Sequence, residues 1–443
     1  MARRSTNTGA EATAPPSDGT SAPTRRAPYS DNPEVGTRGL RTQQRILDAA
    51  LQVFGESGYE RSTLDRIGQL AGCSRVSIYQ YFSGKDDVFR HLAGQVARQM
   101  RASAEALAPL TGDADGWAAL RAWVIRYSDI HARYEAVFRA FGAASQSDAN
   151  LAGGSARAGE RNLAVFQSKL ATTTLPPRQL EPVVALLMAG VTRTLDTASI
   201  LGAALPDVYT RDRVADAVAD VVHRSLFGVR PEVNARPRNN EPAPSLRIGA
   251  TFTTLFERTG ELEREATQPG RRALASLLQV GQDVIVGRGY HGTRVDDVVA
   301  AAGVSHGAFY RYFENKDELV QVVAVRSLRA VSEALAEVPP AGDRAALRRW
   351  LRHYNALHAA EGAMIRVWVE AVDDPMRDDR AAIFDWGRRQ LARLLRDRGF
   401  GDIAVDSLVL LAVLEAFGSQ EREPVEVDAA VHVVEHGFLG LEG

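Results

Sequence analysis

Two matching stretches of sequence decide the fold of this chain: GYERSTLDRIGQLAGCSRVSIYQYFSGKDDV at 58–88 and GYHGTRVDDVVAAAGVSHGAFYRYFENKDEL at 289–319. They lie 231 residues apart, and the alignment extends without a gap to 41–89 and 272–320, where 14 of 49 positions are identical. Such agreement is rare between unrelated helical segments. The chain therefore contains an internal repeat.

A second match extends the repeat beyond these blocks. ALRAWVIRYSDIHA at 119–132 aligns with ALRRWLRHYNALHA at 346–359, at an offset of 227 residues. The repeat thus includes an N-terminal and a more C-terminal part of each half. We infer two similar units, roughly 37–228 (unit one) and 271–441 (unit two), each within the usual size range of one or two domains.

Nearly all of both units has a pattern typical of α-helix. Apolar residues recur at three- and four-residue spacing, as in Ile46, Leu47, Ala50 and Val53. No series of alternating strand segments interrupts them. We predict an all-α fold.

The segments outside the units differ in composition. Residues 1–36 are rich in Ala, Thr, Ser, Pro and Gly without apolar periodicity, which predicts a disordered tail. A linker is predicted at 229–270, because residues 229–245 carry four prolines. Within it, residues 246–266 have one apolar face, which predicts a short helix ending before Gln268.

The repeated block predicts two helices joined by a short turn. Ser62 and Thr293 stand at matching positions where a hydroxyl can cap the first helix by accepting a backbone N–H. Ala71-Gly72 ends that helix in unit one, since glycine adopts tight turns, and Ser74 can cap the next. Two helices with such a turn form a helix-turn-helix, whose second helix can enter the major groove of DNA.

The second helix of each repeat carries side chains suited to phosphates and base edges. We assign Ile78 and Phe82 to the core. Lys85 and Lys316, two of only three lysines in the chain, begin the following helix, where a cation and free backbone N–H groups can meet a phosphate. The predicted DNA-contacting residues are Ser62, Thr63, Ser74, Arg75, Ser77, Tyr79, Gln80, Tyr81 and Lys85 in unit one, and Thr293, Arg294, Ser305, His306, Tyr310, Arg311, Tyr312 and Lys316 in unit two.

These residues resemble the TetR/AcrR family of bacterial repressors, with its pattern of Gly-Tyr, Thr-Thr, Ala-Gly-Val-Ser, Tyr-x-x-Phe and Lys-x-x-Leu. Unit one departs from the pattern at Cys73 and unit two at Arg294. The tandem layout resembles the duplicated TetR-type regulators of actinobacteria. The resemblance implies a cytoplasmic, DNA-binding transcriptional regulator that acts as a repressor, which is the family's usual role. It implies no enzymatic activity and no cofactor.

The resemblance also divides each unit. We expect a three-helix DNA-binding domain at 37–100 and at 271–325, followed by a helical regulatory domain at 101–228 and at 326–443. In this family a small molecule enters the regulatory domain and lowers operator affinity by changing the separation of the recognition helices. We therefore expect two partners, an operator in double-stranded DNA and an apolar, lipid-like effector.

One helical face in each regulatory domain is a candidate for binding this effector. Its aromatic and histidine side chains are spaced four residues apart and so share a face. They form either a packed helix seam with a hydrogen-bonded histidine or the wall of a ligand pocket. The residues on this face are Trp123, Tyr127 and His131 in unit one, and Trp350, Tyr354 and His358 in unit two. Phe138 and Trp368 are expected to add apolar walls to such a pocket.

Duplication within one chain has a consequence for DNA recognition. TetR-type proteins usually act as symmetric dimers, and here the last helices of the two units, around 183–200, 212–227, 407–418 and 427–439, can form the equivalent interface inside one chain. This favours a monomeric pseudo-dimer over a homodimer, and the unlike recognition helices predict an asymmetric operator. The alternative is a regulator in which one unit no longer contacts DNA and serves only in dimerisation or sensing.

Composition narrows the other possibilities. The formal charge of −2, from 53 basic and 55 acidic residues, gives no bulk attraction to DNA, and a single cysteine cannot form an intrachain disulfide. The longest apolar run, near Val183–Val191, is about half of the ~20 residues of a membrane helix, so we expect no membrane partner. A GxGxxG pattern at 287–292 suggests a dinucleotide site, but the matching 56–61 lacks two of its glycines, which argues against that site.

Overall fold

The computed structural model describes residues 37–170, 172–239, 241, 243–265, 268–370, 379–419 and 421–441. The predicted disordered tail, 1–36, lies outside these residues. Within them the fold is helical throughout, with only isolated bridges such as that between Pro237 and Phe400. The prediction of an all-α fold is confirmed.

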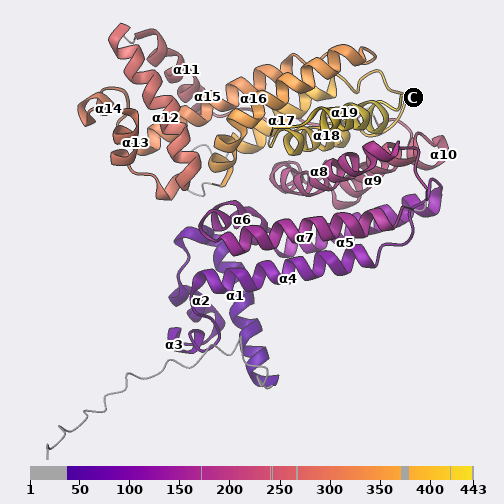
Figure 1. The fold of residues 1–443 in the computed structure, drawn as a ribbon, viewed down its shortest axis with the longest axis horizontal. Helices are drawn as coiled ribbons and strands as arrows, with labels where there is room; N and C mark the ends of the chain where they lie inside the picture. The colour runs from indigo at the N-terminus through magenta and orange to yellow at the C-terminus, as the bar shows by residue number, and fades with distance from the viewer. Residues whose placement is uncertain are drawn as a thin grey trace, which may run out of the picture.

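Unit one consists of a helix-turn-helix domain followed by a bundle of longer helices (Figure 1). Its helices are α1 (Thr37–Arg61), α2 (Leu64–Ala71), α3 (Arg75–Ile78), α4 (Lys85–Glu105), α5 (Ala114–Arg133), α6 (Glu135–Ser147), α7 (Ala149–Ser168), α8 (Pro177–Ala204) and α9 (Arg211–Phe227).

Unit two has a similar order of elements. Its helices are α12 (Gln268–Gly292), α13 (Val295–Ala302), α14 (His306–Tyr312), α15 (Lys316–Ala336), α16 (Arg344–Glu370), α17 (Arg380–Ala392), α18 (Ile403–Gly418) and α19 (Pro424–His432), followed by a π-helical turn, η3 (Val433–Phe438). Two further helices lie in the connection between the units, α10 (Pro231–Asn234) and α11 (Ala250–Glu265).

Each helix-turn-helix domain is organised around its own apolar core. In unit one this core includes Phe54, Ile67, Ile78 and Phe82, none more than 1% exposed, which confirms the assignment of Ile78 and Phe82 to the core. In unit two the core is formed by matching positions, among them Ile285, Val298, Phe309 and Phe313. Burial of one face of each helix therefore fixes which side chains remain available at the surface.

The last helices of the two units pack together within the chain. Helices α8 and α9 lie against α18, α19 and η3, and the side chains between them belong to one continuous apolar core that includes Val191 and Leu411 (Figure 1). At the centre, α8 and α18 approach so closely that a Cβ atom on Gly190 would lie 2.7 Å from Cγ2 of Val413. We call this contact of α8 and α9 with α18, α19 and η3 the inter-unit interface.

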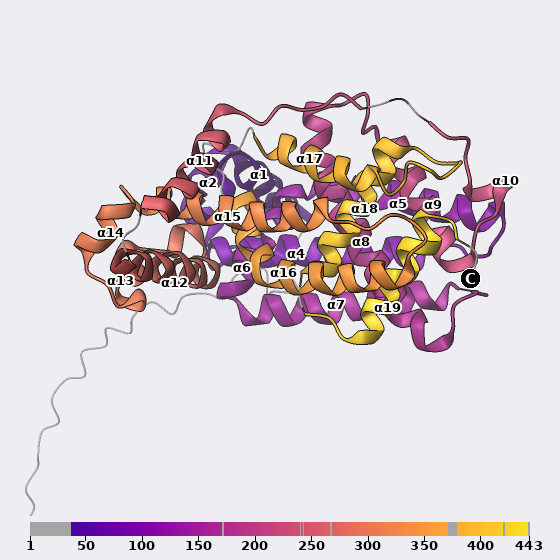
Figure 2. The same cartoon turned by 90° about the horizontal axis from the view of Figure 1, so that it is seen from above.

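The connection between the units is held against both of them. Seen from above, it runs along one edge of the molecule from α10 to α11 (Figure 2). The amide of Asn239 donates to the carbonyl of Gly401 at 2.9 Å, and the amide of Gly401 donates to the carbonyl of Arg236 at 2.9 Å. Backbone pairing thus holds part of the predicted proline-rich linker against unit two.

Buried arginines strengthen this junction. Arg224 of α9 is fully buried, and its Nε donates to the carbonyl of Gly437 at 2.7 Å. Its guanidinium lies 4.8 Å from the ring centroid of Phe400. Nearer the surface, Arg213 pairs with Asp402 at 2.7 Å. Since a buried charge that loses its partners is costly, these contacts favour a single arrangement of the units.

Helix α8 is the most apolar long helix in the described part of the chain. It runs well beyond Val183–Val191, and its length and composition would allow it to cross a membrane, but half of its most apolar stretch is buried inside the protein. Because it packs against α18 and α19, we interpret it as a core helix of the inter-unit interface.

Candidate nucleic-acid interface

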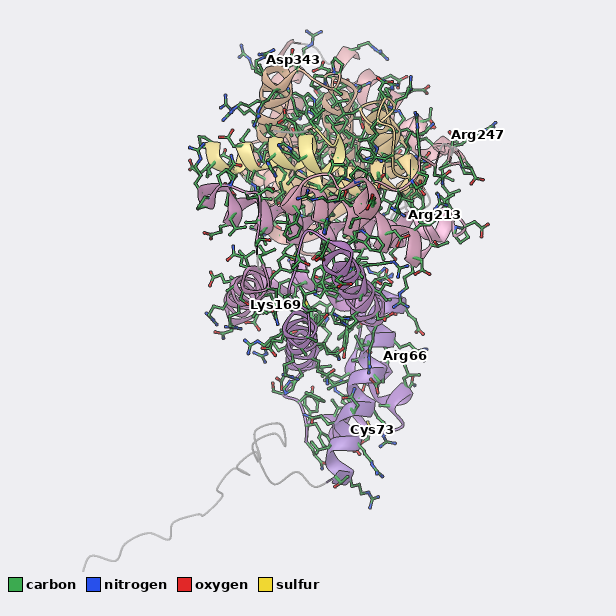
Figure 3. All side chains as sticks on the ribbon, turned by 90° about the vertical axis from the view of Figure 1, so that its right-hand side faces the viewer. Arg66, Cys73, Lys169, Arg213, Arg247 and Asp343 are labelled. Carbon is green, nitrogen blue, oxygen red and sulfur yellow. The ribbon has the colours of Figure 1, made fainter. Side chains whose placement is uncertain are left out.

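Both helix-turn-helix domains lie at the same end of the molecule, one on each side of the inter-unit interface (Figure 1). In unit one, Arg66 and Cys73 mark the narrow projection that this domain forms, away from Arg213 at the junction of the units (Figure 3). In unit two, α13 and α14 occupy the matching position.

The turn between the two helices has the same geometry in both units. Gly72 and Gly303 each adopt a left-handed conformation with φ of 65°, which ends α2 and α13 without strain. In unit one the helices also approach closely, because a Cβ atom on Gly68 would lie 2.8 Å from the carbonyl oxygen of Cys73. Ser74 and Ser305 then cap α3 and α14 through their side chains, as the sequence predicts.

The structure corrects the predicted cap of the first helix. Thr63, not Ser62, caps α2 by accepting from the amide of Arg66 at 3.2 Å. Ser62 and Thr293 are buried, and their hydroxyls donate to the carbonyls of Gly58 and Gly289. These two hydroxyls therefore hold the preceding turn and are not available to DNA. Their place two residues before Leu64 and Val295 gave no sign of this inward orientation.

In unit two, Arg294 occupies the position of Thr63. Its backbone amide donates to Oδ2 of Asp297 at 3.3 Å, so an acidic residue of the helix supplies the contact at this end. The Arg294 side chain is exposed. It remains a candidate for contacting phosphate.

The two recognition helices differ in length and surface. Helix α3 has four residues and continues as a turn, whereas α14 has seven. The exposed candidates are Ser74, Arg75, Gln80, Ser305, His306, Tyr310 and Arg311, and Ser77, Tyr79 and Tyr81 are partly exposed. Val76, which is not among the predicted DNA-contacting residues, is 73% exposed at the start of α3 and offers an apolar surface for a thymine methyl group.

One tyrosine was assigned wrongly. Tyr312 is only 9% exposed, and its hydroxyl donates to the carbonyl of Gly270 at 3.0 Å, so it belongs to the core. Tyr310, two residues earlier, is 57% exposed. Of the tyrosines in α14, Tyr310 is therefore the one that DNA can reach.

A polar side-chain contact holds the recognition helix to the helix before it in each unit, as an ion pair in unit one and as a hydrogen bond in unit two. Arg75 lies 3.1 Å from Asp65, and at the matching positions His306 lies 2.8 Å from Asp296. Arg75 also donates to the hydroxyl of Tyr79 at 3.2 Å. All of these groups are near the surface, where such pairs contribute little to stability, so their effect is to orient the arginine and the histidine.

Lys85 and Lys316 have a structural role that the sequence did not predict. Nζ of Lys85 donates to the carbonyl of Tyr59 at 2.8 Å, and Nζ of Lys316 donates to the carbonyl of Tyr290 at 2.9 Å. Each ammonium also lies over the tyrosine ring, 4.4 and 4.5 Å from its centroid. These carbonyls follow Gly58 and Gly289, whose φ values of 73° and 71° interrupt the helix. In both units, the lysine therefore stabilises the interruption of the preceding helix at its glycine.

Replacing either lysine by methionine is expected to lower the stability of its helix-turn-helix domain by about 1–2 kcal/mol, because carbonyls at the break lose a charged donor. Urea unfolding of Lys85→Met and Lys316→Met measures this. If the ammonium also contacts phosphate, the slope of log affinity against log salt falls by about one as well. Unchanged stability in both variants would contradict the structural role.

The predicted effector-binding face is mostly a packed seam. Trp123, Tyr127, Trp350 and Tyr354 are buried in the large core. The hydroxyl of Tyr127 lies 2.8 Å from that of Thr192, and Nε1 of Trp350 donates to the carbonyl of Ala334 at 2.8 Å. Trp368 is buried in the core of the second helix-turn-helix domain.

The other three candidates meet at a cavity between the units. His131, Phe138 and His358 all line it, so the two histidines that match in the repeat also come together in space. Nε2 of His131 lies 2.7 Å from Asp196, and the His131 ring stacks on Phe138. His358 is buried beside Gly362 and Gly418, where any Cβ atom would collide with its ring.

Acidification is expected to destabilise the protein through His358. Burial, together with Arg366 and Arg193, lowers its pKa to about 4, whereas an unfolded histidine titrates near 6.5. The unfolded chain therefore takes up a proton that the folded protein excludes. The stabilisation from neutral His358 is complete above pH 6.5 and is lost as the pH falls toward 4, by about 2 kcal/mol between pH 6.5 and 5.

Urea unfolding of the wild type and His358→Gln at pH 7 and pH 5 tests this titration. The difference in unfolding free energy between the two proteins should be smaller at pH 5, because only the wild type loses the histidine contribution. An equal difference at both pH values would contradict it.

The GxGxxG segment does not have the setting of a dinucleotide site. It forms the end of helix α12, with Gly289 at the break, and it follows helix and not strand. This agrees with the argument from the repeat.

Comparison with known proteins identifies the two domains. The family model described as "Bacterial regulatory proteins, tetR family" matches residues 46–92 and 277–323. The chain is 47% identical over 49 residues to the HTH-type transcriptional regulator SrpR of Pseudomonas putida. This match covers 11% of this chain and 23% of that protein. It is 37% identical over 73 residues to the HTH-type transcriptional repressor AcnR of Corynebacterium diphtheriae. This match covers 16% of this chain and 36% of that protein.

A longer match is found with the HTH-type transcriptional repressor DhaR of Mycobacterium sp. (strain GP1), which is 31% identical over 121 residues, or 25% of this chain and 58% of that protein. The matched segments span between 23% and 58% of these relatives, which is less than two thirds of each. The chain thus carries, in tandem, two helix-turn-helix domains that match the tetR family of bacterial regulatory proteins.

Proposed function

We propose that the chain is a cytoplasmic transcriptional regulator, a repressor, that reads one operator with both of its helix-turn-helix domains. The observation that carries this proposal is the arrangement of the two domains at one end of a shared interface inside a single chain (Figure 1). The interface is apolar and continuous, as expected for a contact that does not dissociate. A single chain would then do what two subunits do in a symmetric dimer.

The operator is expected to be asymmetric. Unit one presents Arg75, Val76 and Gln80, whereas unit two presents His306 and Arg311 with glycine in place of the valine. Arginine pairs well with guanine, glutamine with adenine, and an apolar side chain with the thymine methyl group. The two half-sites should therefore differ in sequence.

Regulation by a small molecule completes the proposal. An effector that binds one separation of the helix-turn-helix domains better than another shifts the protein toward that separation and changes operator affinity. The cavity shared by His131 and His358 supports such a mechanism, since it lies between the units. An apolar, lipid-like molecule is the effector that the family resemblance suggests.

One observation favours a second candidate, in which unit one has lost DNA contact. Helix α3 has only four residues, and Tyr79 and Tyr81 lie partly buried in the turn after it. Unit one would then serve as the partner in the interface while unit two alone reads DNA.

Genome-wide recovery of bound DNA, followed by footprinting of the best site, tests the proposal. We expect one protected region with two unlike half-sites, located upstream of genes whose expression rises when the regulator is deleted. A single protected half-site would support the second candidate. Recovery of no specific site would contradict both.

A further inference from the structure

A cavity of about 310 Å³ lies at the inter-unit interface, at the lower end of the roughly 300–1,000 Å³ typical of small-molecule sites. Unit one contributes side chains from α5, α6 and α8, and unit two contributes side chains from α16, α17 and α18. We call it the central cavity. Because both units form its walls, a molecule bound there contacts both.

Part of the wall is apolar. Phe138 and Phe141 of α6, Ile365 of α16 and Phe384 of α17 all line the cavity. These side chains are only partly buried in the protein, so they retain apolar surface that a ligand could cover. They provide a site for a hydrocarbon or aromatic body.

The rest of the wall is charged, with an excess of arginine. Arg193 lies 3.5 Å from Asp196 and 3.7 Å from Glu415. Among the described residues that line the cavity, four are arginines and three are carboxylates, which gives these residues a net charge of +1 when every carboxyl is ionised. Burial raises the pKa of Glu415, which is 17% exposed, to about 7, so its partial protonation at neutral pH increases the positive excess.

The two apolar walls also support the two helix-turn-helix domains. On one side, α6 packs against α1, and Arg139 donates to the carbonyl of Gly55 at 3.3 Å. On the other side, Trp368 of α16 is buried in the core of the second domain, and Gln282 of α12 donates to the carbonyl of Ala360 at 3.1 Å. A change in the separation of α6 and α16 therefore moves both domains.

We propose that the central cavity binds a small amphipathic organic anion, with its acidic group at Arg193 and Arg366 and its apolar body between α6 and α16, and that occupancy lowers operator affinity. A single site per chain follows, since the cavity lies between the units. Binding itself does not depend on the proposed function; only the effect on the operator rests on it.

Titration calorimetry of the full chain with decanoate tests the binding. We expect saturable binding at one molecule per chain, at least tenfold weaker binding of decan-1-ol, which has the same chain without the charge, and no binding of decylamine. Equal affinity for decanoate and decan-1-ol, or no saturable binding of decanoate, would overturn the proposal.

Three variants locate the site. Arg366→Met and Arg193→Met should each weaken decanoate binding at least tenfold, whereas Arg352→Met, which removes the same charge from an exposed position on α16, should leave it unchanged. Ile365→Trp, which fills the cavity, should abolish binding while thermal unfolding remains cooperative. Unchanged decanoate affinity in the two cavity arginine variants and in Ile365→Trp would place the anion elsewhere and overturn the proposal.

Operator binding separates this proposal from the proposed function. Decanoate should weaken the wild-type complex with its operator and should not affect that of Ile365→Trp. Binding of decanoate without any change in operator affinity would overturn the regulatory part. A chain that binds decanoate but no specific DNA would instead contradict the proposed function and leave the anion site intact.

Discussion

Leucine in place of Gly190 is expected to open the inter-unit interface and to lower the free energy of unfolding by about 3 kcal/mol or more. A Cβ atom alone at this position would lie 2.7 Å from Cγ2 of Val413, a stiff β-branched side chain on α18. Overpacking of a filled core usually costs about 1–3 kcal/mol, and here neither helix can move without disturbing the contacts of α8 and α9 with α18 and α19. Operator affinity should fall as well, because the two helix-turn-helix domains lose their fixed separation.

A matched control is available on the same helix. Gly202 of α8 has no neighbour closer than 3.8 Å to an added Cβ, so Gly202→Ala should stabilise the protein by about 0.5–1 kcal/mol, as alanine does within a helix. Gly190→Ala should instead lower the free energy of unfolding. Urea unfolding of the three variants measures these values, and a Gly190→Leu protein as stable as the wild type would show that α8 and α18 do not meet in solution.

Alanine at Tyr310 is expected to weaken operator binding about tenfold or more, because this exposed side chain projects from the longer recognition helix. Tyr79→Ala should weaken binding to the same operator by a smaller factor, since Tyr79 is partly buried and pairs with Arg75. Affinity is measured by titration of labelled operator at two salt concentrations.

Tyr312→Phe provides the control for this pair. It removes the buried hydroxyl that donates to the carbonyl of Gly270, so it should reduce stability without changing operator affinity at a temperature where the protein is folded. Loss of affinity in Tyr310→Ala but not in Tyr79→Ala would favour the regulator in which unit one has lost DNA contact. Loss in neither would contradict the assignment of the recognition helices.

The helix-turn-helix domains could be predicted from sequence because their signals are local. Glycine at the turn and serine before the second helix act within a few residues, and Gly72 and Ser74 have the predicted roles. Tyr312 was misplaced because its burial depends on Gly270, a residue 42 positions earlier in the chain. Local spacing cannot distinguish it from Tyr310, which follows the same aromatic pattern.

Features that depend on contacts between the units could be predicted only in part. The repeat shows that His131 and His358 are equivalent, but equivalence does not imply proximity, and their meeting at the central cavity follows from how α8 packs on α18. The proline content of 229–245 predicts a linker, but not the backbone pairing of Asn239 with Gly401 that holds this linker against unit two. Such long-range pairing leaves no periodic pattern in the sequence.

The central claim is that one chain supplies both DNA-binding domains to one operator. Native mass spectrometry of the protein with its footprinted operator tests this directly, because the 48.1 kDa chain is readily distinguished from a dimer. We predict a complex of one chain with one duplex, in which both unlike half-sites are protected. A complex of two chains on a palindromic site, with one half-site for each chain, would contradict the account.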